Sequence, residues 1–196
     1  MKNLFKFYCE DKSLYKDSKF IQDLERLFED AVVDKRAIGD VITTVINEQS
    51  IEQFYKINNF FKLYSWISKQ ILTVSDSLGF VESNNTVKVN IERIWANKMF
   101  KGSSGQCHIH QLKNKHSGIA VFYVDAPENS AKLVVIPNGK QETKIEEYKK
   151  EECEYIDVMS GNLIVHPSTL PHAVSTHNSD KPRICIVIEF YYELAP

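Results

Sequence analysis

The chain has 196 residues, of which 43% are hydrophobic and 26% charged, and its formal net charge is −2. These values are typical of one globular domain with a full core. The balanced charge gives no basic surface for nucleic acid or an anionic membrane. No apolar run approaches the roughly 20 residues that span a bilayer. We therefore expect neither a nucleic-acid partner nor a membrane.

The cysteines and the N-terminus indicate the compartment. Cys9, Cys107, Cys153 and Cys185 have neither metal-type nor redox-type spacing. Residues 1–10 lack the apolar region and the cleavage site of a signal peptide. We therefore expect reduced thiols in a cytoplasmic protein. A homodimer stays open, because the pattern does not decide the oligomeric state.

Apolar residues in the first part of the chain recur at helical spacing. One stripe covers residues 20–28 and a second covers residues 38–46. Each stripe predicts a helix with one buried face.

Two further helices are expected before the pattern changes. Ser50-Ile51-Glu52-Gln53 has the form of a capping box, which predicts a helix start. A stripe over residues 61–78 predicts a helix that ends near Gly79. Asn58-Asn59 is a candidate break between the two.

From about residue 86 the pattern becomes that of short strands. Val87, Val89 and Ile91 alternate with polar residues, and turn pairs such as Asn138-Gly139 separate the later segments. About eight short strands at this spacing predict a sandwich or jelly roll. We expect them near residues 87–97, 106–110, 119–125, 132–136, 155–158, 162–165, 172–176 and 183–192.

These elements predict one domain over residues 1–196, of the α+β class but mainly β. Residues 1–85 would form a helical part that packs on a double-stranded β-helix, a cupin-like jelly roll, over residues 86–196. The highly charged segment Lys140–Glu154 is expected to be a solvated loop or a short helix.

His108-Ile109-His110 is a candidate metal-binding pair. Side chains alternate along a strand, so the two histidines share a face, and neutral imidazole is the commonest metal ligand. His172 follows a buried strand and a proline-bounded turn, and a jelly roll can bring it beside the pair. Three imidazoles suit Fe, Zn, Cu or Ni. The alternative is a pair of surface histidines on an edge strand.

Arg183 opens the most apolar strand of the chain, and Cys185 shares its face. If the side chain points inward, its guanidinium group can bind a carboxylate through two hydrogen bonds. The alternative is an arginine at an exposed strand end.

Several motifs in a fixed order resemble a known family. They are Trp95-x-Asn97, His108-x-His110, Pro167-Ser168 with Leu170-Pro171-His172-Ala-Val, and Arg183-Ile184. Over roughly residues 50–192 the chain resembles the 2-oxoglutarate- and iron-dependent oxygenases of phages and bacteria, in particular a subgroup with a His-x-His pair.

The resemblance implies a jelly-roll oxygenase. His108, His110 and His172 would form the catalytic centre and hold ferrous iron. Arg183 would bind the distal carboxylate of the co-substrate 2-oxoglutarate. The implied reaction is oxidative decarboxylation of 2-oxoglutarate to succinate, coupled to hydroxylation of a C–H bond. Better-known oxygenases use two histidines and one carboxylate, and His110 stands where that carboxylate would be.

Four further residues are candidates for this site. Tyr123 and Asn97 could contact the co-substrate, with a core tyrosine and a turn or strand-end asparagine as the alternatives. Asp125 and Glu189 are carboxylate ligands only if His110 is not one, and we expect both to contact solvent instead.

The remaining histidines are expected to be structural or exposed. His166 is predicted to be a hydrogen-bonded residue at a strand end, with a further metal ligand or an acid–base group as the alternative. His116 and His177 lie in polar segments and are predicted to be solvent-exposed. Cys107 alternates to the face opposite His108, which excludes it as a ligand.

Two other functions compete with the oxygenase, and the substrate is not indicated. A cupin-like metalloprotein that does not use 2-oxoglutarate is suggested by Gly102 followed by His108-x-His110. A jelly-roll binding or structural protein with a degenerate site is the second. Arg183 separates the first alternative from the oxygenase, and metal content separates the second.

Overall fold

Two antiparallel sheets form the body of the protein. The computed structural model describes residues 4–35, 37–44, 50–78, 87–112 and 116–194. The seven-stranded sheet contains, in order, β1 (Phe5–Tyr8), β10 (Asn162–Pro167), β7 (Ser117–Asp125), β12 (Arg183–Leu194), β5 (Val87–Met99), β4 (Val41–Thr43) and β2 (Val32–Val33). The five-stranded sheet contains β3 (Ala37–Ile38), β6 (Ser104–His108), β11 (His172–Val174), β8 (Leu133–Val135) and β9 (Glu154–Ile156).

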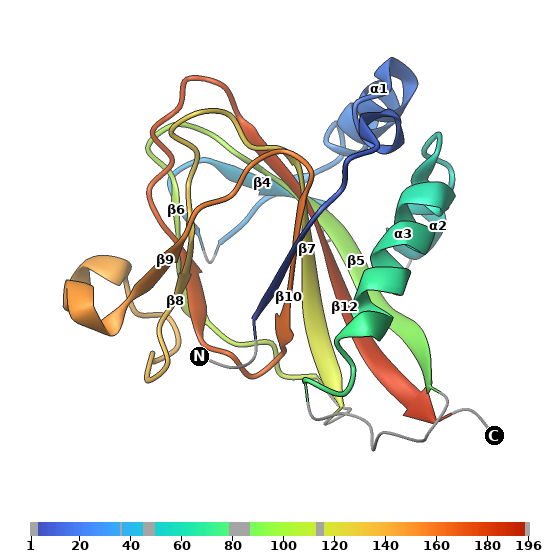
Figure 1. Cartoon of the computed structure of the whole chain (residues 1–196). Helices are drawn as coiled ribbons and strands as arrows, with labels where there is room; N and C mark the ends of the chain where they lie inside the picture. Colours follow the sequence, from blue (N-terminus) through green and yellow to red (C-terminus); the bar gives the residue numbers. More distant parts are fainter. Residues whose placement is uncertain (1–3, 36, 45–49, 79–86, 113–115, 195–196) are drawn as a thin grey trace.

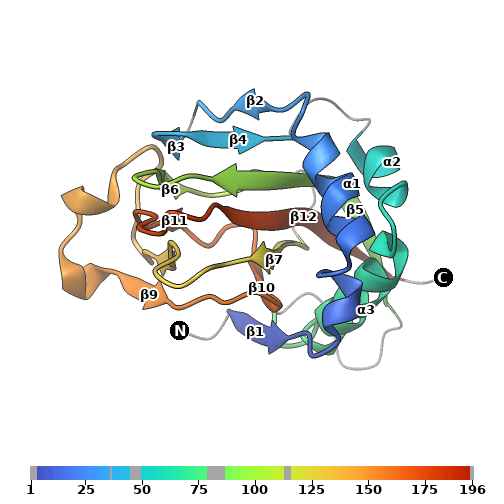
Figure 2. The same cartoon turned by 90° about the horizontal axis from the view of Figure 1, so that it is seen from above.

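The α-helices form a third layer on the seven-stranded sheet. Figure 1 shows α1, α2 and α3 on one side of this sheet and the five-stranded sheet on the other. Figure 2 shows β1 and β2 at its opposite edges. The described helices are α1 (Ser18–Leu27), α2 (Ser50–Tyr55), α3 (Phe60–Thr73) and the short 3-10 segments η1 (Lys12–Leu14), η2 (Ile145–Glu147) and η3 (Lys150–Glu152). None of the helices in these ranges is both long and apolar enough to cross a membrane.

The central strands are buried on both faces, which explains their unbroken apolar sequences. On β12, Ile184 and Ile186 pack with the helices in the main core. Cys185 and Val187 face the five-stranded sheet in a second core. The fold is therefore the predicted double-stranded β-helix, and all eight predicted strands are present.

The predicted helix over residues 38–46 is wrong. Residues 37–38 and 41–43 form β3 and β4, joined through Gly39 at φ +81°. This stretch is rich in β-branched residues, which favour strands, and β4 pairs with β5. Residues 45–46 lie outside the described ranges. With β1 and β2, the described part of residues 1–85 contributes four strands and is not helical throughout.

The other helix predictions are confirmed, with shifted ends. Asp17 caps α1 by accepting bonds from the amides of Lys19 and Phe20, and α2 begins at Ser50. Asn59, at φ 60°, separates α2 from α3 as expected. The last helix ends at Thr73, before the end of its apolar stripe, and the predicted stop Gly79 is outside the described residues. The charged segment Lys140–Glu154 carries η2 and η3.

Adjacent residues of α3 test how the helical layer is held. Ile71 is 0% exposed in the main core, whereas Leu72 is 40% exposed. We expect Ile71→Ala to lower the free energy of unfolding by about 2–5 kcal/mol, through lost burial and the cavity left behind. Leu72→Ala, the matched control, should cost less than about 1 kcal/mol. Urea denaturation measures both, and equal losses would contradict this packing.

Candidate metal centre

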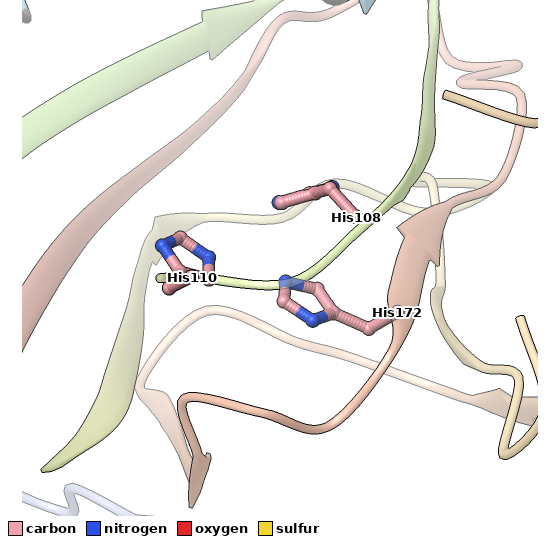
Figure 3. A group of neighbouring side chains, drawn as sticks. All are labelled: His108, His110 and His172. Carbon is pink, nitrogen blue, oxygen red and sulfur yellow. The ribbon is translucent and has the colours of Figure 1, made fainter. Parts of the chain in front are cut away.

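His108, His110 and His172 converge between the two sheets. His108 ends β6, His172 opens β11, and the antiparallel register pairs them directly. His110 lies just past β6, where its amide donates to the carbonyl of Ser168. One ligand nitrogen from each histidine lies within 4.8 Å of the other two. Figure 3 shows the three rings gathered around a common space.

Hydrogen bonds orient each of these rings. The Nδ1 atoms lie 2.9 Å from the carbonyl oxygen of Gln106 for His108, 2.8 Å from that of Leu170 for His172, and 2.7 Å from Oε1 of Glu189 for His110. An oxygen acceptor requires the proton on Nδ1, which in a neutral ring leaves the lone pair on Nε2. Burial also lowers the pKa of His172 well below its ordinary value, which favours the neutral ring there. Three imidazoles held in this way fit a divalent metal ion.

Glu189 is buried behind His110. Its side chain is 1% exposed, and it bonds to His110 through one oxygen and to Arg93 through the other. Burial opposes ionisation, but the bonds from His110 and Arg93 outweigh it and lower the pKa of Glu189. The predicted solvent contact is therefore wrong, because β12 turns this residue inward.

A pocket extends from the histidines toward the start of β12. Asn97, Tyr123 and Arg183 line the same pocket as the three histidines. Its remaining lining is largely apolar and includes Trp95, Ile119, Val121, Leu133, Cys185 and Val187. The predicted metal ligands and the predicted co-substrate contacts are thus brought into one cavity.

Arg183 presents a buried charge to this pocket. The residue is 4% exposed, and its guanidinium carbon lies 4.8 Å from the centroid of the Tyr123 ring. No acidic side chain in the described part of the chain pairs with it. Buried charges are normally paired, so this end of the pocket is suited to an anion.

Unpartnered polar atoms lie beside that charge. Nε of Arg183, the hydroxyl of Tyr123 and Oδ1 of Asn97 are buried without a hydrogen-bond partner. Burial raises the pKa of Tyr123 to about 12, so its hydroxyl keeps the proton that it can donate. These groups leave hydrogen-bonding capacity for a bound polar molecule.

The other candidates are not members of the group of three histidines. Asp125 is partly exposed and contacts Lys16 and Ser160, at 3.1 and 3.2 Å. His166 is fully buried, with Nδ1 bonded to the carbonyl of Pro167, and its ring centroid lies 4.6 Å from that of His172. Cys107 packs in a separate apolar cluster on the opposite face of β6, as predicted.

The prediction for His177 is wrong. This residue is 0% exposed. Its Nδ1 accepts from the amide of Ala131, and its Nε2 donates to the carbonyl of Lys181. Its polar neighbours in sequence indicated a surface loop, but the side chain holds two loops together. His116 is half-buried, not fully exposed.

Glu189 is the residue whose role the sequence analysis missed. A pattern could have found it, since Arg183, Cys185, Val187 and Glu189 alternate on one face of β12. A glutamate on the same face as the candidate anion site would therefore point inward.

Comparison with known proteins gives a family match. Residues 93–189 match the model of the family described as "Putative 2OG-Fe(II) oxygenase". This segment runs from Arg93 to Glu189 and contains the three histidines and Arg183. No curated protein matches the chain.

Solved structures share the fold at low sequence identity. A Pseudomonas putida prolyl-4-hydroxylase has a TM-score of 0.63 and 11% identity, with 97% of this chain and 93% of that chain covered. A Trichoplax adhaerens prolyl hydroxylase, in complex with a hypoxia-inducible-factor peptide, has a TM-score of 0.66 and 14% identity, with 97% of this chain and 84% of that chain covered. HygX from Streptomyces hygroscopicus, with nickel, 2-oxoglutarate and hygromycin B bound, has a TM-score of 0.64 and 11% identity, with 97% of this chain and 83% of that chain covered.

Removing one imidazole tests the metal centre. We expect His172→Ala to weaken Co(II) binding by more than the 10- to 100-fold that is typical for loss of an outer-shell partner. Isothermal titration calorimetry of the metal-free protein measures the affinity. His116→Ala, which lies outside the pocket, is the control and should bind like the wild type. Unchanged affinity in the His172 variant would exclude this residue as a ligand.

Proposed function

The chain belongs to the 2OG-Fe(II) oxygenase family, and we propose that His108, His110 and His172 hold its iron while Arg183 binds 2-oxoglutarate. The enzyme is then a dioxygenase. The chemistry that bound iron supplies with 2-oxoglutarate and oxygen is decarboxylation of the oxoacid to succinate, coupled to oxidation of a substrate C–H bond.

The observation that carries this proposal is the unpaired guanidinium of Arg183. A buried arginine without a carboxylate partner would be costly, and a carboxylate of 2-oxoglutarate would supply that partner through paired hydrogen bonds. Arg183 shares a pocket with the three histidines, so one molecule could reach both ends. A cupin-like protein that does not use 2-oxoglutarate would give Arg183 no role.

Each group has a separate task in this proposal. The histidines offer Nε2 lone pairs in fixed directions, because their Nδ1 protons are held by oxygen acceptors. The guanidinium group of Arg183 packs over the ring of Tyr123, and the Tyr123 hydroxyl can donate to the same carboxylate. The apolar lining from Ile119 and Val187 excludes water from the reacting region.

Substitution of Arg183 tests the co-substrate site. We expect Arg183→Gln to weaken 2-oxoglutarate binding at least about 100-fold, since a charge-assisted bidentate contact is lost. Co(II) affinity should stay unchanged, because Arg183 is not a candidate ligand. Calorimetry without oxygen measures both, and succinate formation in air with Fe(II) measures turnover.

A matched control and a clear negative result accompany that test. Arg26→Gln changes an exposed arginine on α1 and should leave 2-oxoglutarate binding intact. Equal 2-oxoglutarate affinity in Arg183→Gln and the wild type would exclude Arg183 from the co-substrate site. Wild-type protein that binds Fe(II) but no 2-oxoglutarate would contradict the proposed function.

A further inference from the structure

Among the described residues, the candidate metal shell consists of three imidazoles and contains no carboxylate. We propose that Glu189 is a positioning residue of this centre, which supplies through His110 the negative charge that a coordinated carboxylate would otherwise supply. The inference rests on the proposed function, since it takes His110 as a metal ligand.

The contact between Glu189 and His110 has the geometry for this role. Oε1 lies 2.7 Å from Nδ1, the ring nitrogen that faces away from the other two histidines. A carboxylate at this position fixes the Nδ1–H tautomer and the orientation of the ring. It also increases the electron density at Nε2, where the metal would bind. The negative charge is therefore on Glu189, and the His110 ring separates it from the position of the metal ion.

The second carboxylate oxygen is anchored from outside the site. Arg93 lies opposite Glu189 in the register of β5 and β12, and its side chain is 55% exposed while that of Glu189 is 1% exposed. The pair thus keeps the carboxylate ionised and in place from the solvent side. Trp95, whose ring centroid lies 6.0 Å from that of His110, covers the imidazole. Low polarity around a hydrogen bond strengthens its electrostatic effect.

A purely structural role for Glu189 is the competing explanation. The ion pair with Arg93 would by itself join β5 to β12, and losing it would destabilise the sheet. If this were its only role, the effect of Glu189→Gln on metal affinity would not depend on which side chain occupies position 110. The proposed role predicts that the effect of Glu189 changes sign when residue 110 is itself a carboxylate, because two neighbouring carboxylates repel.

Four proteins decide between these explanations: the wild type, Glu189→Gln, His110→Asp and the double variant. Co(II) affinity of the metal-free proteins is measured by calorimetry, and the visible spectrum of bound Co(II) reports its coordination. With His110 present, Glu189→Gln should weaken binding about 10- to 100-fold. In the His110→Asp background, the same Glu189→Gln change should strengthen binding. Glu193→Gln, an exposed position on the same strand, is the matched control and should bind like the wild type.

The outcomes separate this inference from the proposed function. A loss of less than about threefold in Glu189→Gln, or an equal loss in both backgrounds, leaves no coupling between the two positions and overturns the role of Glu189 alone. If the wild type binds neither Co(II) nor 2-oxoglutarate, the proposed function and this inference fail together. Thermal denaturation checks that each variant is folded.

A measurement on the unaltered protein covers the case in which Glu189→Gln does not fold. Nitrogen-15 NMR of the metal-free wild type identifies the ring nitrogen of His110 that carries the proton, with His110→Asp used for assignment. We expect the Nδ1–H tautomer, with a proton protected from exchange. An Nε2–H tautomer would overturn the inference, since Glu189 would then not hold the ring.

Discussion

Burial of β12 on both of its faces is the constraint on which the rest of the structure depends. One face packs against the helices, and the other lines the cavity between the sheets. Alternation along the strand therefore assigns every second residue to the site. Arg183 opens β12 and lines the cavity, whereas Glu189, six residues further along the same face, lies behind His110. The same strand thus orients a buried cation and a buried anion, with Cys185 and Val187 between them.

The two buried charges are satisfied in different ways. Glu189 is ionised and bonded to His110 and Arg93, so its charge is balanced within the protein. Arg183 contacts the ring of Tyr123, but in the described part of the chain it has no carboxylate partner. A buried charge without a partner lowers the stability of the folded protein. An anion bound at Arg183 would pair with this charge and so offset the loss.

The sequence is sufficient where local patterns decide the structure. Alternation predicts the strands from residue 87 onward, and spacing brings His172 to the His108 pair because a jelly roll has few ways to connect such strands. Sequence patterns fail to predict residues 37–43, where β4 is stabilised by pairing with β5, far away in sequence. The prediction for His177 is wrong for a related reason, because its neighbours in sequence are polar and only its contacts with Ala131 and Lys181 reveal its burial. Glu189 differs, since alternation along β12 indicates its inward direction, but its bond to His110 depends on a segment far away in the sequence.

The position of β12 within its sheet also bears on how the protein reaches its folded state. It lies between β7 and β5, although every other strand of the sheet precedes it in the chain. During synthesis the earlier strands therefore have no central partner, and their apolar edges stay open until β12 has left the ribosome. Because the pairings are also distant in sequence, folding should be slow relative to helical proteins of this size. The strand that completes the sheet also delivers Arg183 and Glu189, so the site can form only at the last stage of assembly.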